Sequence, residues 1–204
     1  LESRVVARTA ELEQLNGMLD AAYEDLDKTF VLAVNVFSSL MEMRGSHTGH
    51  ARRVADLSRE TAKRLGLSER DVRDVYLAAL VHDIGTIAFP DAMLDKPVST
   101  YTADEHQRYR RHTIEGETAL MALSQLQGVA KIVRQHHERV DGKGFPDGLA
   151  GAAITMGARI VAAASDLDEL THGALGELTL SEDKAHSMLT GGVGSHYDGA
   201  VVET

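Results

Sequence analysis

Residues 68–86 read SERDVRDVYLAALVHDIGT, and this stretch indicates the fold class. Ser68, followed three residues later by Asp71, resembles a capping box, in which polar side chains bind the free backbone amides that begin a helix. An apolar run, YLAALV at 76–81, follows and ends in His82-Asp83. Because burial of an imidazole and a carboxylate costs free energy unless both are satisfied, we expect this helix to deliver them to an interior site with a partner.

Helices are predicted on both sides of this stretch, and strand signals are few. The expected helices and connections are 47–65 ending at Gly66, a loop marked by Pro90 and Pro97, a second capping box at Thr102 and Glu105 beginning a helix past His112, a helix around 129–136, a glycine-rich loop at 141–151, a helix at about 155–170, another from Ser181, and a last turn capped by Asp198. The fold class is therefore predicted to be all-α, with a long N-terminal coiled-coil helix before a helical bundle.

The N-terminal segment has a different pattern. Apolar residues step by three and four from Val5 through Leu12, Leu15, Leu19 and Leu26, with charged residues between them. This is a heptad seam, and we interpret residues 1–38 as a parallel dimeric signalling connector and 39–204 as the domain that does the chemistry. Asn16-Gly17 interrupts the seam. The alternative is a single amphipathic helix packed on the domain.

Composition excludes several classes of protein. The 204 residues are 43% hydrophobic and 25% charged, as in a globular chain, and no run reaches the roughly 20 apolar residues of a membrane span. A net charge of −10 argues against indiscriminate nucleic-acid binding. The absence of cysteine excludes disulfides and thiolate metal sites and fits the cytoplasm. The chain begins at Leu1 without Met and has no signal peptide, so we interpret it as part of a longer polypeptide.

Histidine and aspartate carry the candidate chemistry, because ten histidines are many for this length. His136-His137-Glu138 repeats the arrangement of His82-Asp83 at the end of another predicted helix, just before the glycine-rich loop. His50, His112 and Asp166 lie on three further helices. Imidazole with carboxylate suits Fe, Mn or Zn, and a carboxylate can bridge two ions. For any one histidine the ordinary role is a hydrogen-bonded core residue, but the set together favours a metal centre inside a helical bundle.

The order of these motifs resembles the HD-GYP branch of the HD-domain phosphohydrolases. The resemblance covers about residues 40–204 and rests above all on the string HHERVDGKGFPDGL at 136–149, with Gly157-Ala158-Arg159-Ile160-Val161 and the late 194–198 in support. It implies an HD-type helical bundle, here preceded by the long N-terminal coiled-coil helix, with two or three Fe or Mn ions. It also implies hydrolysis of cyclic di-GMP to pGpG, and often on to GMP, by metal-activated hydroxide.

Motif matching carries the family's site onto this chain. The implied metal ligands are His50, His82, Asp83, His112, His136, His137 and Asp166, with Asp83 and His82 as the catalytic pair. Such domains usually follow a receiver or sensor domain, as in response regulators, which fits the heptad segment.

The sequence departs from the family pattern at four positions. Thr86 stands where a phosphate-binding Lys is usual, and Phe145 replaces the signature Tyr. Ser46 replaces a Glu ligand found in some members, which favours a binuclear centre. His47 beside it is interpreted as a surface residue. Ser165 occupies the usual position of the last Asp ligand, so Asp166 is the predicted ligand and Asp168 the weaker candidate.

Substrate contacts are expected from the residues around the motifs, namely Thr86, Arg139, Lys143, Asp141, Gly142, Gly144 and Arg53. For the cations among them the ordinary alternative is a solvated surface charge. Residues 141–147 have a second possible role, which is to dock a partner such as a diguanylate cyclase domain. Three functions stay open: a cyclic-dinucleotide phosphodiesterase, including one for cyclic GMP–AMP; a degenerate module that binds nucleotide or partner and signals through the coiled coil; and a phosphohydrolase of nucleotide monoesters.

Overall fold

A computed structural model describes residues 2–44, 48–94, 96–173 and 179–204. Ser46 and His47 therefore lie outside the described residues. The chain divides into two units, Leu1–Val36 and Phe37–Thr204. The first consists of most of helix α1, which runs from Glu2 to Glu42 without a break at Gly17, where nothing lies near the missing side chain. None of the helices in the described ranges has both the length and the apolar character of a membrane crossing.

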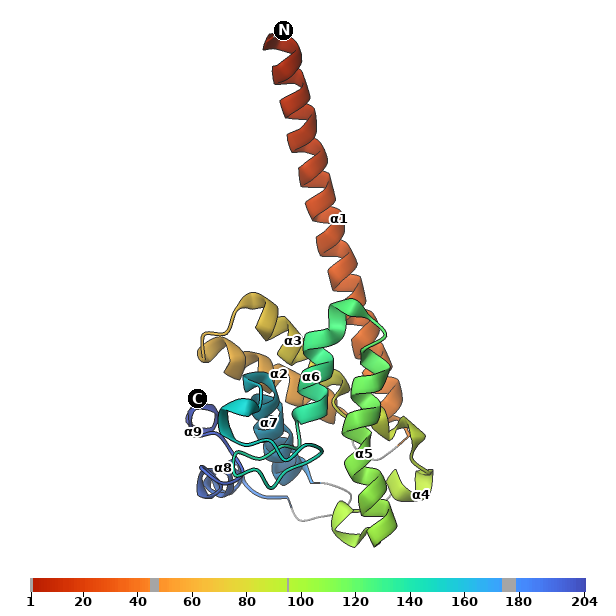
Figure 1. Cartoon of the computed structure of the whole chain (residues 1–204), viewed down its shortest axis with the longest axis vertical. Coiled ribbons are helices and arrows are strands. Elements are labelled where there is room, and N and C mark those ends of the chain that lie inside the picture. The colour runs from red at the N-terminus through yellow and green to blue at the C-terminus, as the bar shows by residue number, and fades with distance from the viewer. Residues whose placement is uncertain (1, 45–47, 95, 174–178) are drawn as a thin grey trace. The chain divides into compact units, whose positions relative to one another are not determined.

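The second unit is a bundle of helices, and its described part contains no strands, only two isolated bridges (Figure 1). The all-α prediction is confirmed. Its elements are α2 (His50–Arg64), α3 (Glu69–Val81), η1 (Ile84–Ala88), α4 (Asp91–Leu94), η2 (Val98–Thr100), α5 (Ala103–Leu120), η3 (Ser124–Leu126), α6 (Gln127–Gln135), η4 (Gly151–Ala153), α7 (Met156–His172), α8 (Glu182–Gly191) and α9 (Gly199–Val202).

Local signals begin these helices as the sequence predicts. The Ser68 side chain accepts from the Asp71 amide at the start of α3, and Thr102 with Glu105 forms a complete capping box on α5. Asp198 caps α9 by accepting from the Ala200 amide. Each cap satisfies amides that have no partner within the helix, which is why the beginnings of helices can be read from short motifs.

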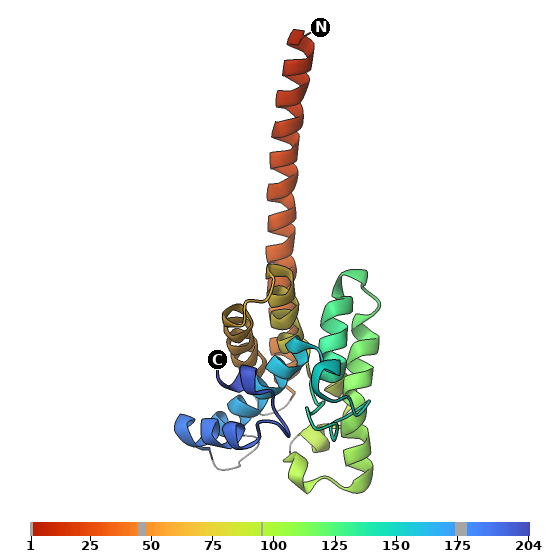
Figure 2. The same ribbon diagram turned by 60° about the vertical axis from the view of Figure 1, so that its left-hand side comes forward.

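The core lies where α3 packs against α2, α6 and α7. Its largest fully buried side chains include aliphatic ones such as Leu77, Ile160 and Val133, together with the imidazoles of His112 and His136. α5 lies beside α6, as both views show (Figures 1 and 2). Helices α3 and α6 end within this arrangement, and His82 and His136 directly follow their last residues.

Close backbone packing brings the His-Asp turn to α5. Gly85 in η1 lies against the His112 carbonyl so closely that a Cβ atom would stand 2.0 Å from its oxygen. Real Cβ atoms do not approach that closely, so only glycine permits this contact. The consequence is that Asp83, two residues earlier, lies beside His112.

Candidate metal centre

Two groups of three ligand-type side chains come together inside the second unit. One contains His50, His82 and Asp83, and the other contains His112, His136 and His137. In each group the ligand atoms lie within 4.8 Å of one another. Six of the seven predicted metal ligands are thus brought together from α2, α5 and the ends of α3 and α6.

The Asp83 carboxylate lies between the two groups. One of its oxygens is 3.3 Å from His82 Nε2, and the other is 3.5 Å from His112 Nε2. A carboxylate that presents one oxygen to each of two ligand groups has the arrangement of a ligand bridging two cations. The ends of α3 and α6 also favour cations here, because the carbonyl end of a helix carries partial negative charge.

Hydrogen bonds at Nδ1 orient four of the five histidines. The Nδ1 of His82 donates to the Ala79 carbonyl at 2.8 Å, that of His136 to the Val133 carbonyl at 2.6 Å, and that of His112 to the Tyr109 carbonyl. His50 Nδ1 donates to the Asp168 carboxylate at 2.7 Å. Because these oxygens only accept, each of the four Nδ1 atoms carries a hydrogen, and a ring in its neutral form then directs an Nε2 lone pair at the site.

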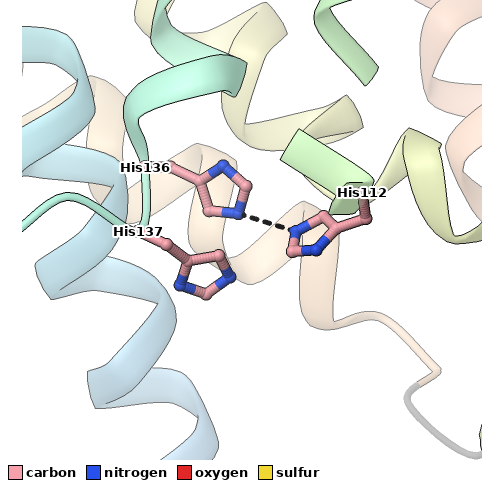
Figure 3. Close-up of side chains that lie close together, drawn as sticks. All are labelled: His112, His136 and His137. Atoms are coloured by element: carbon pink, nitrogen blue, oxygen red, sulfur yellow. Dashed lines mark hydrogen bonds between the residues drawn. The ribbon is translucent and has the colours of Figure 1, made fainter. Parts of the chain in front are cut away.

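Two of these lone pairs face each other. The Nε2 atoms of His112 and His136 are 3.3 Å apart, as the dashed line in Figure 3 marks. With the hydrogens at Nδ1, neither nitrogen donates to the other, and a cation that binds both lone pairs would satisfy the pair. The donor set therefore fits a metal ion on an observation independent of any family resemblance.

The electrostatics agree with neutral imidazoles in the second group. Burial lowers the pKa of His136 and His137 well below the usual value, and the neighbouring histidines lower it further. Burial also lowers the pKa of His112. Burial opposes charge on His82 too, but Asp83 outweighs it and raises the pKa of His82 to about 9. Burial would raise the pKa of Asp83, but the charge and hydrogen bond of His82 hold it well below its ordinary value.

The glycine-rich loop holds His137 in place. The Phe145 ring stacks on the His137 ring with centroids 4.7 Å apart, and the Phe145 amide donates to the His137 carbonyl at 3.1 Å. Gly144 lies against this backbone, where a Cβ would come within 2.5 Å of the His137 carbonyl oxygen. Buried Glu138 accepts from the amides of Asp147, Gly148 and Leu149 and so ties the loop to α6. Sequence reasoning gave Glu138 no such role.

A pocket opens beside the two groups. Its wall includes His50, His82, Asp83 and His137, together with apolar and aromatic side chains from several elements, namely Phe37, Met41, Phe89, Leu94, Val98, Tyr101 and Tyr109. Lys96 also lines it and forms an ion pair with Glu105 at 2.7 Å. Tyr109 holds His137 through a 3.1 Å contact between its hydroxyl and Nε2. The sequence analysis singled out neither Lys96 nor Tyr109.

Of the predicted substrate contacts, only Thr86 lines this pocket. Its hydroxyl donates to the Asp83 carbonyl at 2.7 Å, so it holds the turn that carries Asp83. Arg139 and Lys143 both lie beside Asp141, and Gly142 and Gly144 shape their loop. Arg53 makes two hydrogen bonds to Asp168. None of these six described residues is among those that line this pocket.

The structure does not bring the predicted last ligand into either group. Asp166 joins neither group, because its carboxylate accepts from the Tyr197 hydroxyl at 2.6 Å and lies 3.7 Å from His196 Nε2. Asp168, the weaker candidate, accepts hydrogen bonds from His50 and Arg53 and so orients the His50 ring. Glu169, which the sequence analysis did not consider, lines the pocket.

The sequence profile of the HD domain family matches residues 35–201. The chain belongs to the HD domain family. The family recognised from the histidine motifs is thus confirmed, and the matched range covers almost all of the second unit.

Named relatives share long stretches of this HD domain. The cyclic di-GMP phosphodiesterase response regulator RpfG of Xanthomonas campestris is 42% identical over 62% of this chain and 34% of its own length. The 3′3′-cGAMP-specific phosphodiesterase 1 of Vibrio cholerae is 36% identical over 65% of this chain and 31% of its own length. The chain thus spans about a third of each of these relatives.

A solved structure confirms the fold of the HD domain. Bd1817, an HDG"Y"P protein from Bdellovibrio bacteriovorus, superposes with a TM-score of 0.64 at 24% identity, over 78% of this chain and 50% of that chain.

Proposed function

We propose that this HD domain is a metal-dependent phosphodiesterase that opens a cyclic dinucleotide, cyclic di-GMP in the first place. The observation that carries the proposal is the Asp83 carboxylate, which presents one oxygen to each of two three-ligand groups. Such a centre suits hydrolysis of a phosphodiester, and the named relatives supply the substrate class. A binuclear Fe or Mn centre is proposed because imidazole with carboxylate suits these ions.

The residues proposed to hold the ions are His50, His82 and Asp83 for one and His112, His136 and His137 for the other, with Asp83 shared. When bound, divalent ions lower the pKa of water and neutralise charge on phosphoryl oxygens. Asp168, Ala79, Tyr109 and Val133 hold the imidazoles with Nε2 directed at the site.

The pocket wall determines how the dinucleotide lies. Phe37, Phe89 and Tyr101 offer apolar and aromatic surface for a purine in the pocket that Asp83 also lines, which supports a pose with the phosphate at the ligand groups. Lys96, in the same wall, supplies a positive charge near the position where Thr86 lacks one. Its ion pair with Glu105 keeps the ammonium group in place when no phosphate is bound.

A chromatographic assay tests this function. Protein purified without oxygen and loaded with Mn(II) or Fe(II) is incubated with cyclic di-GMP and, separately, with cyclic GMP–AMP, and bound metal is counted in the same sample. We expect linear product at two ions per chain and loss of product in Asp83→Asn. Asp56→Asn on the surface of α2 is the control. Metal without product from either nucleotide supports the degenerate signalling module, and a chain without metal overturns the enzyme.

Pairing of α1 with a second copy belongs to the same proposal. Leu12, Leu15, Leu19 and Leu26 follow the heptad seam and each is more than half exposed. A parallel dimer would bury this seam and connect the HD domain to an upstream receiver or sensor domain in the cytoplasm. Light scattering at micromolar concentration is expected to give twice the chain mass, and Leu15→Glu/Leu19→Glu to give the mass of one chain. A monomeric wild-type chain contradicts it.

A further inference from the structure

Helix α7 faces the metal centre with a residue that is a weak ligand. Ser165 is buried, and its hydroxyl lies 3.5 Å from His50 Nε2. The ring is directed at this point because Asp168 holds its other nitrogen. The face of α7 that carries residue 165 is therefore the one turned to the ligand group of His50, His82 and Asp83. A serine there supplies no negative charge to an ion.

The next acidic residue along α7 is directed elsewhere. Asp166 lies about 100° further around the helix, and the Tyr197 hydroxyl donates to its carboxylate. Asp168 is held by Arg53 and His50. Both carboxylates would have to leave short hydrogen bonds to reach an ion.

Glu169 returns to the face of Ser165, because four residues make slightly more than one helical turn. Side chains on a helix lean toward its N-terminus, so a residue one turn after Ser165 extends back over it. Glutamate is also one methylene longer than aspartate. In agreement with this geometry, Glu169 lines the pocket together with Ser165, His82 and Asp83.

The Glu169 carboxylate is also free to bind. Among the residues that the structure describes, none makes a hydrogen bond or ion pair with it, in contrast to Asp166 and Asp168. It stands outside both ligand groups, and the three torsions of a glutamate let it move while the helix stays in place. The Glu169 side chain is exposed because it opens into the pocket, but the protein around the pocket still desolvates its carboxylate. Desolvation, with Asp166 and Asp83 nearby, raises its pKa to about 8.

We propose that Glu169 supplies the carboxylate ligand to the ion held by His50, His82 and Asp83, in place of a carboxylate at position 165. This inference rests on the proposed metal centre. It makes Ser165 and Glu169 one functional unit, in which the carboxylate comes from the residue one turn after the buried serine on α7.

Metal binding tests the inference without an activity measurement. Mn(II) is titrated calorimetrically into the metal-free wild-type chain and into three variants, Glu169→Gln, Asp166→Asn and Ser165→Asp/Glu169→Gln. Circular dichroism verifies that each is folded. We expect two ions in the wild type and about 10- to 100-fold weaker binding of one ion in Glu169→Gln. The double variant is expected to recover the lost affinity, because it returns a carboxylate to the same coordination position, and Asp166→Asn to bind like the wild type.

The outcomes separate this inference from the function on which it rests. A wild-type chain that binds no ion overturns the proposed function and the inference together. Two ions in the wild type with unchanged affinity in Glu169→Gln overturn the inference alone. A loss in Asp166→Asn but not in Glu169→Gln also overturns it and assigns Asp166. Failure of the double variant to recover, although folded, shows that Glu169 does not stand in for residue 165.

Discussion

The side chain whose replacement is most informative is Asp168, because it contacts no proposed ion and yet orients His50. It accepts from His50 Nδ1 at 2.7 Å and from Arg53 Nε and Nη2 at 2.6 and 2.9 Å, and only 6% of its side chain is exposed. In Asp168→Asn the side chain keeps its shape but loses the charge that holds Arg53. Its amide can also donate to His50 Nδ1, which moves the ring hydrogen to Nε2.

Two magnitudes follow from this geometry. Loss of one charge from a buried pair costs about 3–5 kcal/mol, and because asparagine retains one acceptor and Arg53 is partly exposed, we expect the free energy of unfolding to fall by about 2–3 kcal/mol. Removal of the partner of a ligand imidazole weakens metal binding about 10- to 100-fold, here at one of two ions.

Urea unfolding of the metal-free chain followed by circular dichroism measures the first effect, and Mn(II) calorimetry measures the second. Asp56→Asn is the matched control, since its carboxylate also meets two arginines but its side chain is 41% exposed; we expect it to cost less than about 1 kcal/mol. An Asp168→Asn chain that binds both ions as tightly as the wild type would refute the orienting role. Equal stability of the two variants would refute the burial argument.

Three further predictions concern packing, pH and metal. Gly85→Ala places a methyl group against the His112 carbonyl, and we expect the free energy of unfolding to fall by about 3 kcal/mol and Tm by roughly 10 °C. Gly17→Ala meets no neighbouring atom and is expected to stabilise helix α1 by about 1 kcal/mol. Equal melting curves for the two variants would contradict this. The Arg134 guanidinium lowers the pKa of Asp147 below 3.8, so the pair stabilises the fold above about pH 4 and this contribution is lost as the pH falls. In urea titrations the difference in free energy of unfolding between Arg134→Gln and the wild type should therefore narrow below about pH 4. A difference that stays constant with pH would contradict the assignment. A chelator should abolish hydrolysis of cyclic di-GMP and added Mn(II) restore it, so that persistent activity in the metal-depleted chain would exclude the centre.

Helix beginnings and the ligand motifs could be predicted because both depend on neighbours in the sequence. Ser68 and Thr102 cap their helices through residues three positions away, and His82-Asp83 is recognisable as a pair. Gly17 shows the limit of such reasoning, since its cost of about 1 kcal/mol is too small to break a long helix.

The assignments on α7 depended on distant partners and were not readable in advance. Tyr197 and Arg53, which hold the Asp166 and Asp168 carboxylates, lie 31 residues after Asp166 and 115 before Asp168. A shift of 100° per residue then changes which carboxylate is available. The position of Lys96 in the pocket wall was missed for the same reason, because no spacing connects it to Asp83.

Three of the site imidazoles take their orientation from the carbonyl three residues earlier on their own chain segment: Ala79 for His82, Tyr109 for His112 and Val133 for His136. Only His50 relies on a residue 118 positions away. Each of these three rings is therefore already restricted when its own helix forms. The conformational entropy needed to orient these three donors is lost at helix formation and not when the bundle assembles. Docking of the helix ends then completes a centre in which three donors are already aligned, whereas His50 must wait for α2 and α7 to meet and His137 for Tyr109 on α5.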